Sequence, residues 1–254
     1  MVPWRVIGCA VRGLGMQNGL YVALSGQVSM ERRLETIANN VANMNTVGFR
    51  ADGVSFATEL AKAGDHNIAY VSPGSTYINR DAGPTTKTGN PLDVAVQGDG
   101  WFGIDTRNGV AYTRDGRMRL SENGALETLT GNAVLDAGGA PIMLDPNAGA
   151  PVISGDGMIS QNGRQVGAIG LYAIDDNANL TRTENSGVVP DKPATPILDF
   201  TKNGVLQGYT EGSNVNPIEE MSRLIEVTRG FDGVNAQVSQ TEASMQDAIK
   251  SLAG

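Results

Sequence analysis

Apolar residues recur at spacings of three and four in two segments at opposite ends of the chain, Leu20–Met44 and Leu224–Leu252. This seven-residue period predicts helices with a narrow apolar stripe, which is buried by coiling against the stripe of a partner helix. The first stripe, here called the first seam, consists of Leu20, Ala23, Met30, Leu34, Ile37, Val41 and Met44. The second seam consists of Leu224, Val227, Phe231, Val234, Val238, Thr241, Met245, Ala248 and Leu252. One such helix is more simply explained by packing on its own domain, whereas two at opposite termini favour assembly between copies.

The first helix is predicted to run from about Met16 to Asn43, where asparagines and then Gly48 end it. Asn39 and Asn40 disfavour a helix interior, because asparagine side chains compete for backbone hydrogen bonds. Two interpretations stay open: a frayed helix end, or a polar junction with a neighbouring subunit.

The second helix has a clearer predicted start. Asn216 can cap it, Pro217 suits the first helical position, and Glu219 can reach back to the cap amide. Gly230 and Gly233 interrupt the helix, so either close packing compensates for them or the helix bends there.

Between the helices, short alternating stretches separated by two-residue turns predict antiparallel strands. Val110–Arg114 and Arg117–Leu120, joined by Asp115-Gly116, predict a hairpin, and Leu92–Val96 and Ala168–Ile174 predict further strands. The same turn type recurs at Asn123-Gly124, Asp156-Gly157, Asn162-Gly163 and Asn203-Gly204.

The predicted fold class is therefore α+β, with a β-rich, hairpin-based domain inserted between two terminal helices. We expect residues 16–45 and 211–254 to form a coiled-coil core domain, 46–75 an extended connector and 76–210 a β-rich outer domain. Residues 1–15 differ in character and are expected to be a non-native or disordered extension, with translation starting at Met16.

Composition narrows the function classes. The net charge of −8 and the absence of a basic run argue against nucleic acid or an anionic membrane surface as a partner. One histidine, His66, and one cysteine, Cys9, are too few for thiolate sites, imidazole clusters or catalytic triads, so no cofactor or metal is expected. No segment approaches the ~18 apolar residues of a membrane span. Asp93 and Asp99 could act as an acid and base pair in a glycosidase-like cleft, although nothing in the sequence brings them together.

Several motifs of this chain resemble the flagellar rod and hook family, the axial proteins of the bacterial flagellum. Leu34–Phe49 is similar to the family's amino-terminal signature, apart from Met44 and Val47. Central and carboxy-terminal motifs are matched by Leu92–Phe102, Tyr112–Gly116, Gln207–Tyr209, Ser213–Asn216 and Glu219–Met221. The length excludes the short rod subunits and the longer hook proteins of the family, which leaves a proximal or a distal rod subunit. Pro91, Trp101 and Pro217 are more similar to the proximal subunit.

The resemblance implies a structural subunit of the basal-body rod, with no enzymatic activity. Its partners would be copies of itself, other rod proteins and the flagellar type III export apparatus, which exports such subunits to the periplasmic rod without a cleaved signal. The candidate assembly residues are Leu20, Leu34, Ile37, Ala38, Asn39, Asn40, Val41, Asn43, Thr46, Gly48, Phe49, Asn214, Asn216, Met221, Leu224, Val227, Phe231, Val234, Val238, Met245 and Leu252. Since an unpaired stripe cannot offset its ordering entropy, both ends are expected to be largely disordered in the free monomer. The competing class is a secreted β-rich adhesin or binding module whose helices only dimerise it.

Overall fold

The computed structural model describes residues 11–56, 58–63, 66–71 and 74–253, with side chains described outside 11–23, 58–63, 66–71, 241, 245, 252 and 253. These residues form two compact units. The helical unit comprises the described parts of residues 1–41, 52–76 and 217–254, and the β unit comprises residues 42–51 and 77–216. The fold class is α+β, as the sequence predicts.

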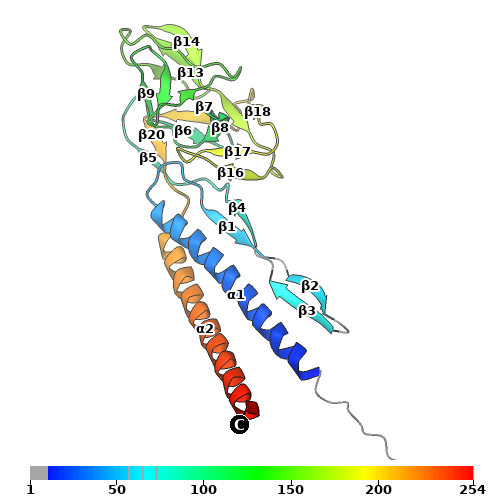
Figure 1. Cartoon of the computed structure of the whole chain (residues 1–254). Coiled ribbons are helices and arrows are strands. Elements are labelled where there is room, and N and C mark those ends of the chain that lie inside the picture. Colours follow the sequence, from blue (N-terminus) through cyan, green and yellow to red (C-terminus); the bar gives the residue numbers. More distant parts are fainter. Residues whose placement is uncertain (1–10, 57, 64–65, 72–73, 254) are drawn as a thin grey trace, which may run out of the picture. The chain divides into compact units, whose positions relative to one another are not determined.

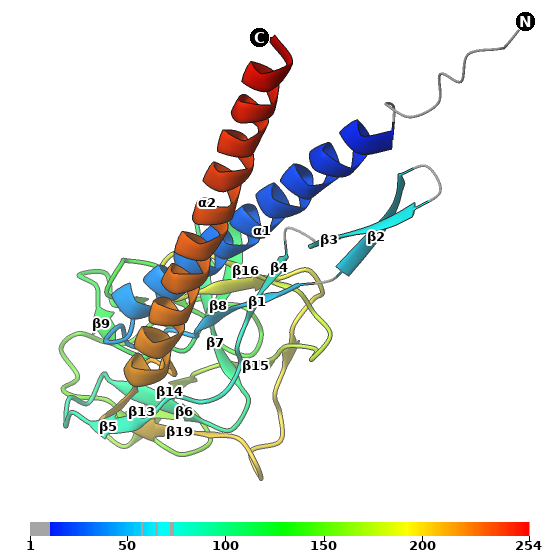
Figure 2. The ribbon, with the colours of Figure 1, turned by 90° about the horizontal axis from the view of Figure 1, so that it is seen from below.

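Two long antiparallel helices dominate the helical unit, and they separate towards the end that carries the N-terminus of α1 and the C-terminus of α2 (Figures 1 and 2). Helix α1 spans Val11–Ala42, so it begins before the predicted start at Met16. Helix α2 spans Pro217–Ala253, which confirms the start predicted from the cap. Glu219 and Glu220 lie in its first turn and Lys250 in its last, where they complement the helix dipole.

Strands occur within residues 46–75, where the sequence predicts an extended connector. β2 (Thr58–Ala63) and β3 (His66–Val71) form a regular antiparallel hairpin. β1 (Asp52–Ser55) pairs with β4 (Ser75–Ile78), at which the chain passes into the β unit.

Every strand pair described in the β unit is antiparallel. Its largest sheet has the order β16-β17-β8-β7-β11-β10-β9, with β15 pairing β7 and β18 pairing β15, and smaller sheets are β12-β13-β14, β19-β6 and β20-β5. The strands are β5 (Thr85–Lys87), β6 (Val94–Gln97), β7 (Trp101–Thr106), β8 (Gly109–Thr113), β9 (Met118–Leu120), β10 (Leu126–Thr128), β11 (Ala133–Val134), β12 (Val152–Ile153), β13 (Met158–Gln161), β14 (Arg164–Ala168), β15 (Leu171–Ala173), β16 (Leu180–Arg182), β17 (Val188–Pro190), β18 (Thr195–Pro196), β19 (Gly204–Gln207) and β20 (Tyr209–Glu211).

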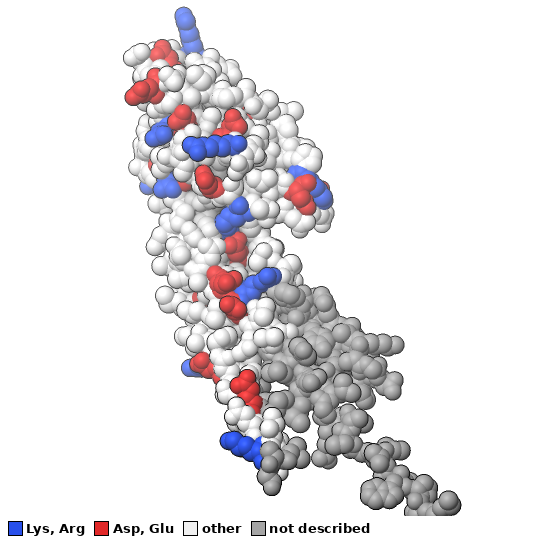
Figure 3. All heavy atoms as spheres, viewed as in Figure 1, with Lys and Arg blue, Asp and Glu red and all other residues white. Residues whose placement is uncertain are grey.

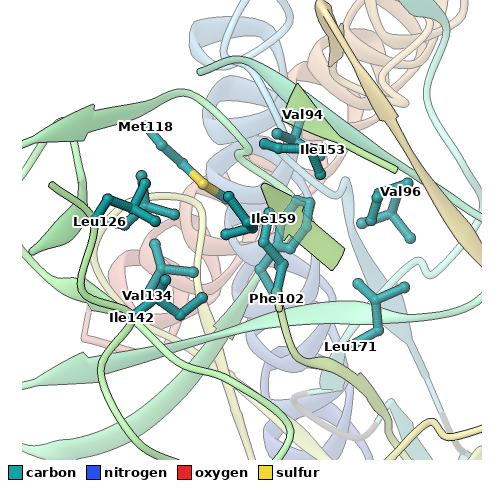
Figure 4. Close-up of a cluster of buried hydrophobic side chains, with 13 residues drawn as sticks. Val94, Val96, Phe102, Met118, Leu126, Val134, Ile142, Ile153, Ile159 and Leu171 are labelled. Atoms are coloured by element: carbon teal, nitrogen blue, oxygen red, sulfur yellow. The ribbon is translucent and has the colours of Figure 1, made fainter. Parts of the chain in front are cut away.

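Aliphatic side chains from several of these sheets form the core of the β unit, around Phe102 (Figure 4). Alternation places them inside: Ile153 and Ile159 are buried, whereas Val152 and Met158 on the other face of the same small sheet are exposed. The core cluster comprises Val94, Val96, Phe102, Met118, Leu126, Val134, Ile142, Leu144, Ile153, Ile159, Ile169, Leu171 and Val205.

The hairpin predicted across Asp115-Gly116 is wrong. β8 pairs with β7 and β17, and β9 pairs with β10. A Cβ on Gly116 would lie 1.6 Å from the carbonyl oxygen of Val94, and the Val94 amide donates to the Gly116 oxygen. Glycine is needed here for close approach of two backbones and not for a reverse turn.

Other turn and strand predictions fare better. Asn162 and Gly163 have φ of 50° and 73°, the left-handed pair of a tight hairpin turn between β13 and β14, which confirms that turn. Leu92–Val96 is confirmed as β6, shifted slightly towards the C-terminus. Ala168–Ile174 is not one strand, because β14 ends at Ala168 and β15 begins at Leu171. Between them, a Cβ on Gly170 would lie 2.4 Å from the Asp136 carbonyl carbon.

Candidate assembly interface

The two helices touch along the middle of α1. Gln27, the polar interruption of the first seam, donates from Nε2 to Asn235 Oδ1 at 2.5 Å. A Cβ on Gly230 would lie 3.2 Å from the Met30 methyl carbon, so glycine allows the helices to approach closely there. The side of α1 that carries the first seam therefore contacts α2 at Gly230 and Asn235, which are not members of the second seam, and the coiled coil stays a prediction.

Burial within the helical unit varies along the predicted seams. Ile37 and Val227 are buried. The half-buried members are Met30, Leu34, Val41, Phe231, Val234 and Val238. Leu224, Met221 and Ala38 are exposed, and the side chains of Leu20, Met245 and Leu252 lie outside the described residues.

The two adjacent asparagines at the end of α1 bind the strand that follows it. Asn40 is 1 % exposed; its Nδ2 donates to the Asp52 carbonyl at 2.9 Å, and its Oδ1 accepts the Asp52 amide at 2.8 Å. Asn39 Nδ2 donates to the Asp52 carboxylate at 2.6 Å. These asparagines hold a polar junction within the chain, because a side-chain amide can satisfy both backbone groups of one residue.

The rest of the amino-terminal signature lies in the β unit. The Thr46 amide and hydroxyl both bind Asn43, at 3.0 and 3.2 Å. Gly48 has φ of 69°, and its amide donates to the Glu211 carbonyl at 2.7 Å. Phe49 is buried beneath the Arg182 guanidinium, whose carbon lies 4.2 Å from the ring centroid.

The carboxy-terminal signature binds the end of the amino-terminal signature and the residues that follow it. Asn214 Oδ1 accepts the Ala51 amide at 2.6 Å, and its Nδ2 donates to the Asp81 carbonyl at 2.8 Å. Asn216 immediately precedes α2. Asn214 therefore joins the last residues of the β unit to its first segment, residues 42–51, and to the start of its second segment at residues 77–81.

A buried ionic network, which the sequence analysis missed, joins the same two segments. Glu211 Oε1 accepts from Arg50 Nη2 at 2.6 Å, and Oε2 accepts from Arg114 Nη1 at 3.1 Å. The Gly83 amide donates to Oε1 at 2.9 Å. Both guanidinium carbons lie over the Trp101 ring, 5.7 and 5.2 Å from its centroid.

Burial governs the electrostatics of this network. It lowers the pKa of Arg114, the Glu211 charge raises that pKa in opposition, and the Arg50 charge lowers it further. Two cations around one anion leave a net positive charge in the interior, so Glu211 is the group on which the network depends. The sequence offered one indication of this network, which is position. Arg114 lies within a motif that resembles the family, and Glu211 lies between two such motifs.

An open pocket of 310 Å³ lies beside this signature in the β unit, lined by Asn43, Thr46, Phe49, Asp115, Arg117, Arg182, Thr183, Asn185 and Ser186. Asp115 binds Arg117 in a bidentate ion pair, with its Oδ1 2.9 Å from Nε and its Oδ2 2.7 Å from Nη2. The pocket is polar, and its lining contains no histidine or cysteine.

The carboxylates considered for acid and base chemistry have other roles. Asp93 is buried and accepts from Asn90 Nδ2 at 2.9 Å, while Asp99 is exposed and its amide donates to the Asn203 side chain. Among the described residues, no three His, Cys, Asp or Glu side chains gather as a metal site would require.

The described helices and the described surface bear on membrane and charge properties. None of those helices combines the length and apolarity needed to cross a membrane. On the described part of the face in Figure 3, acidic and basic side chains are interspersed.

Comparison with known proteins covers most of the chain. Three family models match: "Flagella basal body rod protein" over residues 20–50, "Flagellar hook protein FlgE/F/G D1 domain" over 95–161, and "Flagellar basal body rod FlgEFG protein C-terminal" over 206–252. The chain is 51 % identical to the flagellar basal-body rod protein FlgF of Mesorhizobium japonicum, over 93 % of this chain and 98 % of that protein.

Two further relatives are informative. FlgF of Rhizobium meliloti is 48 % identical, over 94 % of this chain and 99 % of that protein. FlgG of Bacillus subtilis is 31 % identical, over 92 % and 98 %. The family is structural and not enzymatic, which disposes of the glycosidase-like alternative. From these matches along its length, the chain belongs to the flagellar basal-body rod family.

Proposed function

We propose that this chain is a structural subunit of the proximal flagellar rod. Its similarity to FlgF at 51 % identity over nearly the full length of both chains carries the proposal. The identity to the FlgG relative is 31 %, which favours the proximal over the distal rod.

The half-buried seams support assembly through the terminal helices. Leu34, Phe231 and Val238 keep part of their apolar surface in water in the single chain. Coiling against the seams of neighbouring copies would remove that surface from water, at roughly 25 cal/mol per Å². Contacts between unlike surfaces that do not close into a ring generate a helical tube.

Such a tube would be the inner layer of a shaft that transmits torque for motility. A single apolar contact is weak, but a closely packed interior deforms little under load. The export route through the flagellar type III apparatus and the periplasmic position of the rod follow from the family resemblance.

A seam substitution tests this proposal. Val238→Asp should abolish swimming and remove the rod from isolated basal bodies, because it places a charge in the packed seam. The exposed neighbour Ser239 provides the matched control, and Ser239→Asp should leave both intact. Limited proteolysis of the purified Val238→Asp chain should still yield a folded β unit. Swimming cells that carry Val238→Asp would refute the assignment of the seam, and rescue of a strain lacking FlgG, but not of one lacking FlgF, would assign the distal rod.

A further inference from the structure

Asparagine followed by glycine is the pair in which a side-chain amide reacts most readily with its own backbone. Glycine has no Cβ, so its amide nitrogen can approach the side-chain carbonyl carbon of the asparagine before it. The reaction requires that this nitrogen and this side chain are free of other contacts. The pairs in the chain are Asn18-Gly19, Asn108-Gly109, Asn123-Gly124, Asn162-Gly163 and Asn203-Gly204.

Two of these pairs are held by hydrogen-bonded backbone. Asn18-Gly19 lies within α1, and in a helix each interior amide is bonded to the carbonyl four residues earlier. The Gly124 amide donates to the Ser121 carbonyl at 3.0 Å. Attack by either glycine nitrogen would first have to break such a bond, so the fold protects both pairs.

Two further pairs are held at the start of a strand. Gly109 begins β8 opposite β7, and Gly204 begins β19 opposite β6. Asn203 is fixed through its side chain as well, because its Oδ1 accepts the Asp99 amide at 3.0 Å. Pairing in a ladder restricts the backbone rotation that would bring the glycine nitrogen onto the asparagine side chain.

Asn162-Gly163 is open by comparison. The two residues form the turn between β13 and β14, with φ of 50° and 73°, and both are exposed. In the part of the chain that the structure describes, no hydrogen bond engages the Asn162 side chain or the Gly163 amide. A Cβ placed on Gly163 would have no atom within 4 Å, so nothing around the turn obstructs a change of conformation.

The turn also joins two strands that are held less firmly than the core sheet. β14 lies at the edge of the sheet β12-β13-β14, and the register of β13 and β14 shifts between Ile159 and Ser160. Such an irregularity interrupts the ladder, and peripheral segments open at lower cost than core strands. The turn can therefore open briefly while the rest of the β unit stays folded.

We propose that Asn162 is a deamidation site of the folded chain, an inference that does not depend on the proposed function. The Gly163 nitrogen attacks Cγ of Asn162 and forms a new C–N bond. The bond from Cγ to Nδ2 breaks, and Nδ2 leaves as ammonia with the proton of the Gly163 amide. Water then opens the five-membered succinimide ring at either carbonyl, which leaves aspartate or isoaspartate in place of Asn162.

Isoaspartate disturbs the residue before the turn, because the chain then runs through Cβ and Cγ and gains one backbone atom. Gln161 is 3 % exposed; its Oε1 accepts the Asp145 amide at 3.0 Å, and its Nε2 donates to the Asp145 and Gly149 carbonyls at 3.0 and 3.1 Å. The length of a turn sets the register of its hairpin. The longer turn therefore draws Gln161 away from these bonds and loosens residues 145–149.

Incubation of the full chain at mildly alkaline pH tests the site, with mass spectrometry of peptides to assign each deamidation to one residue. Asn162 should deamidate about ten-fold faster than Asn108, Asn123 or Asn203, since freeing a hydrogen-bonded amide costs on that order. In concentrated urea the four rates should become similar, because unfolding frees every glycine amide. Equal rates in the folded chain, or a preference for Asn162 that persists in urea, would overturn the proposal.

Hydrogen exchange tests the structural consequence on the same incubated samples. The Asp145 amide should exchange faster in the isoaspartate fraction, once chromatography has separated it from the unmodified chain. Asn162→Gly is the matched control, because glycine adopts the left-handed turn and has no side-chain amide to lose. Exchange at Asp145 that is as slow in the isoaspartate fraction as in incubated Asn162→Gly would refute the link from the turn to Gln161.

Discussion

Replacing Glu211 by glutamine should unfold the β unit at much lower denaturant concentration. The carboxylate accepts two charge-assisted hydrogen bonds, from Arg50 at 2.6 Å and Arg114 at 3.1 Å, and the Gly83 amide at 2.9 Å. Glutamine keeps the size but removes the charge, and it turns an amide donor towards one guanidinium. Breaking a buried ionic network in this way costs about 3–5 kcal/mol, because two cations are left without a counter-charge.

Trp101 is a suitable reporter, since both guanidinium groups lie over its ring. We would follow its fluorescence during urea unfolding of the monomer in a Trp4→Phe background. With an m-value of about 2 kcal/mol/M, the midpoint should fall by about 2 M.

The chain offers a matched control at its surface. Arg119 Nη2 lies 3.5 Å from Glu127 Oε2, and the Arg119 side chain is exposed, so Glu127→Gln should change the free energy of unfolding by less than about 1 kcal/mol. If Glu211→Gln behaved like Glu127→Gln, the buried network would not be holding the two segments together and the reasoning would be refuted.

Three further predictions concern backbone approach, the asparagine junction and the monomer. Gly116→Ala should destabilise the β unit by about 3 kcal/mol or more in urea unfolding, because its Cβ would lie 1.6 Å from the Val94 oxygen. The control Gly155→Ala should be nearly neutral, because a Cβ there lies 4.0 Å from its nearest neighbour. Equal unfolding midpoints for the two variants would contradict this prediction. Asn40→Ala removes two hydrogen bonds from the Asp52 backbone, which should cost about 2 kcal/mol of local stability. The Asp52 amide should therefore exchange with deuterium roughly 30-fold faster. An unchanged exchange rate would contradict the role of Asn40 in the junction. In the free monomer, amides of α1 and α2 should exchange much faster than those of the β unit, and slow exchange along both helices would show that they are stable without neighbours.

Local signals were sufficient for the helices and for some turns. The start of α2 is determined by Pro217 and its preceding residue, and the turn at Asn162-Gly163 by residues that tolerate left-handed backbone. The helix start and the turn each depend on residues that are adjacent in sequence, so the sequence alone is enough to predict them.

Features that depend on distant segments could not be predicted in this way. Asp115-Gly116 looks like a hairpin turn because the same dipeptide serves turns and close backbone approaches, and only the position of Val94 distinguishes them. The arginine partners of Glu211 lie 161 and 97 residues away in sequence, and no periodicity marks a charge as buried. The apolar spacing of the seams includes the buried Ile37 and Val227 and also the exposed Leu224, so spacing alone does not determine which seam residues are buried within one chain.

The ladders that complete the β unit have a kinetic consequence. β19 and β20 pair with β6 and β5, which precede them by more than 100 residues, so the last pieces of this framework are made long after the first. Such non-local pairing slows folding, and at a synthesis rate of about 5–20 residues per second the nascent polypeptide waits roughly 5–20 s before it can close. For the proposed export route, that delay is the interval in which the export apparatus would bind the chain before a stable β unit has to be unfolded.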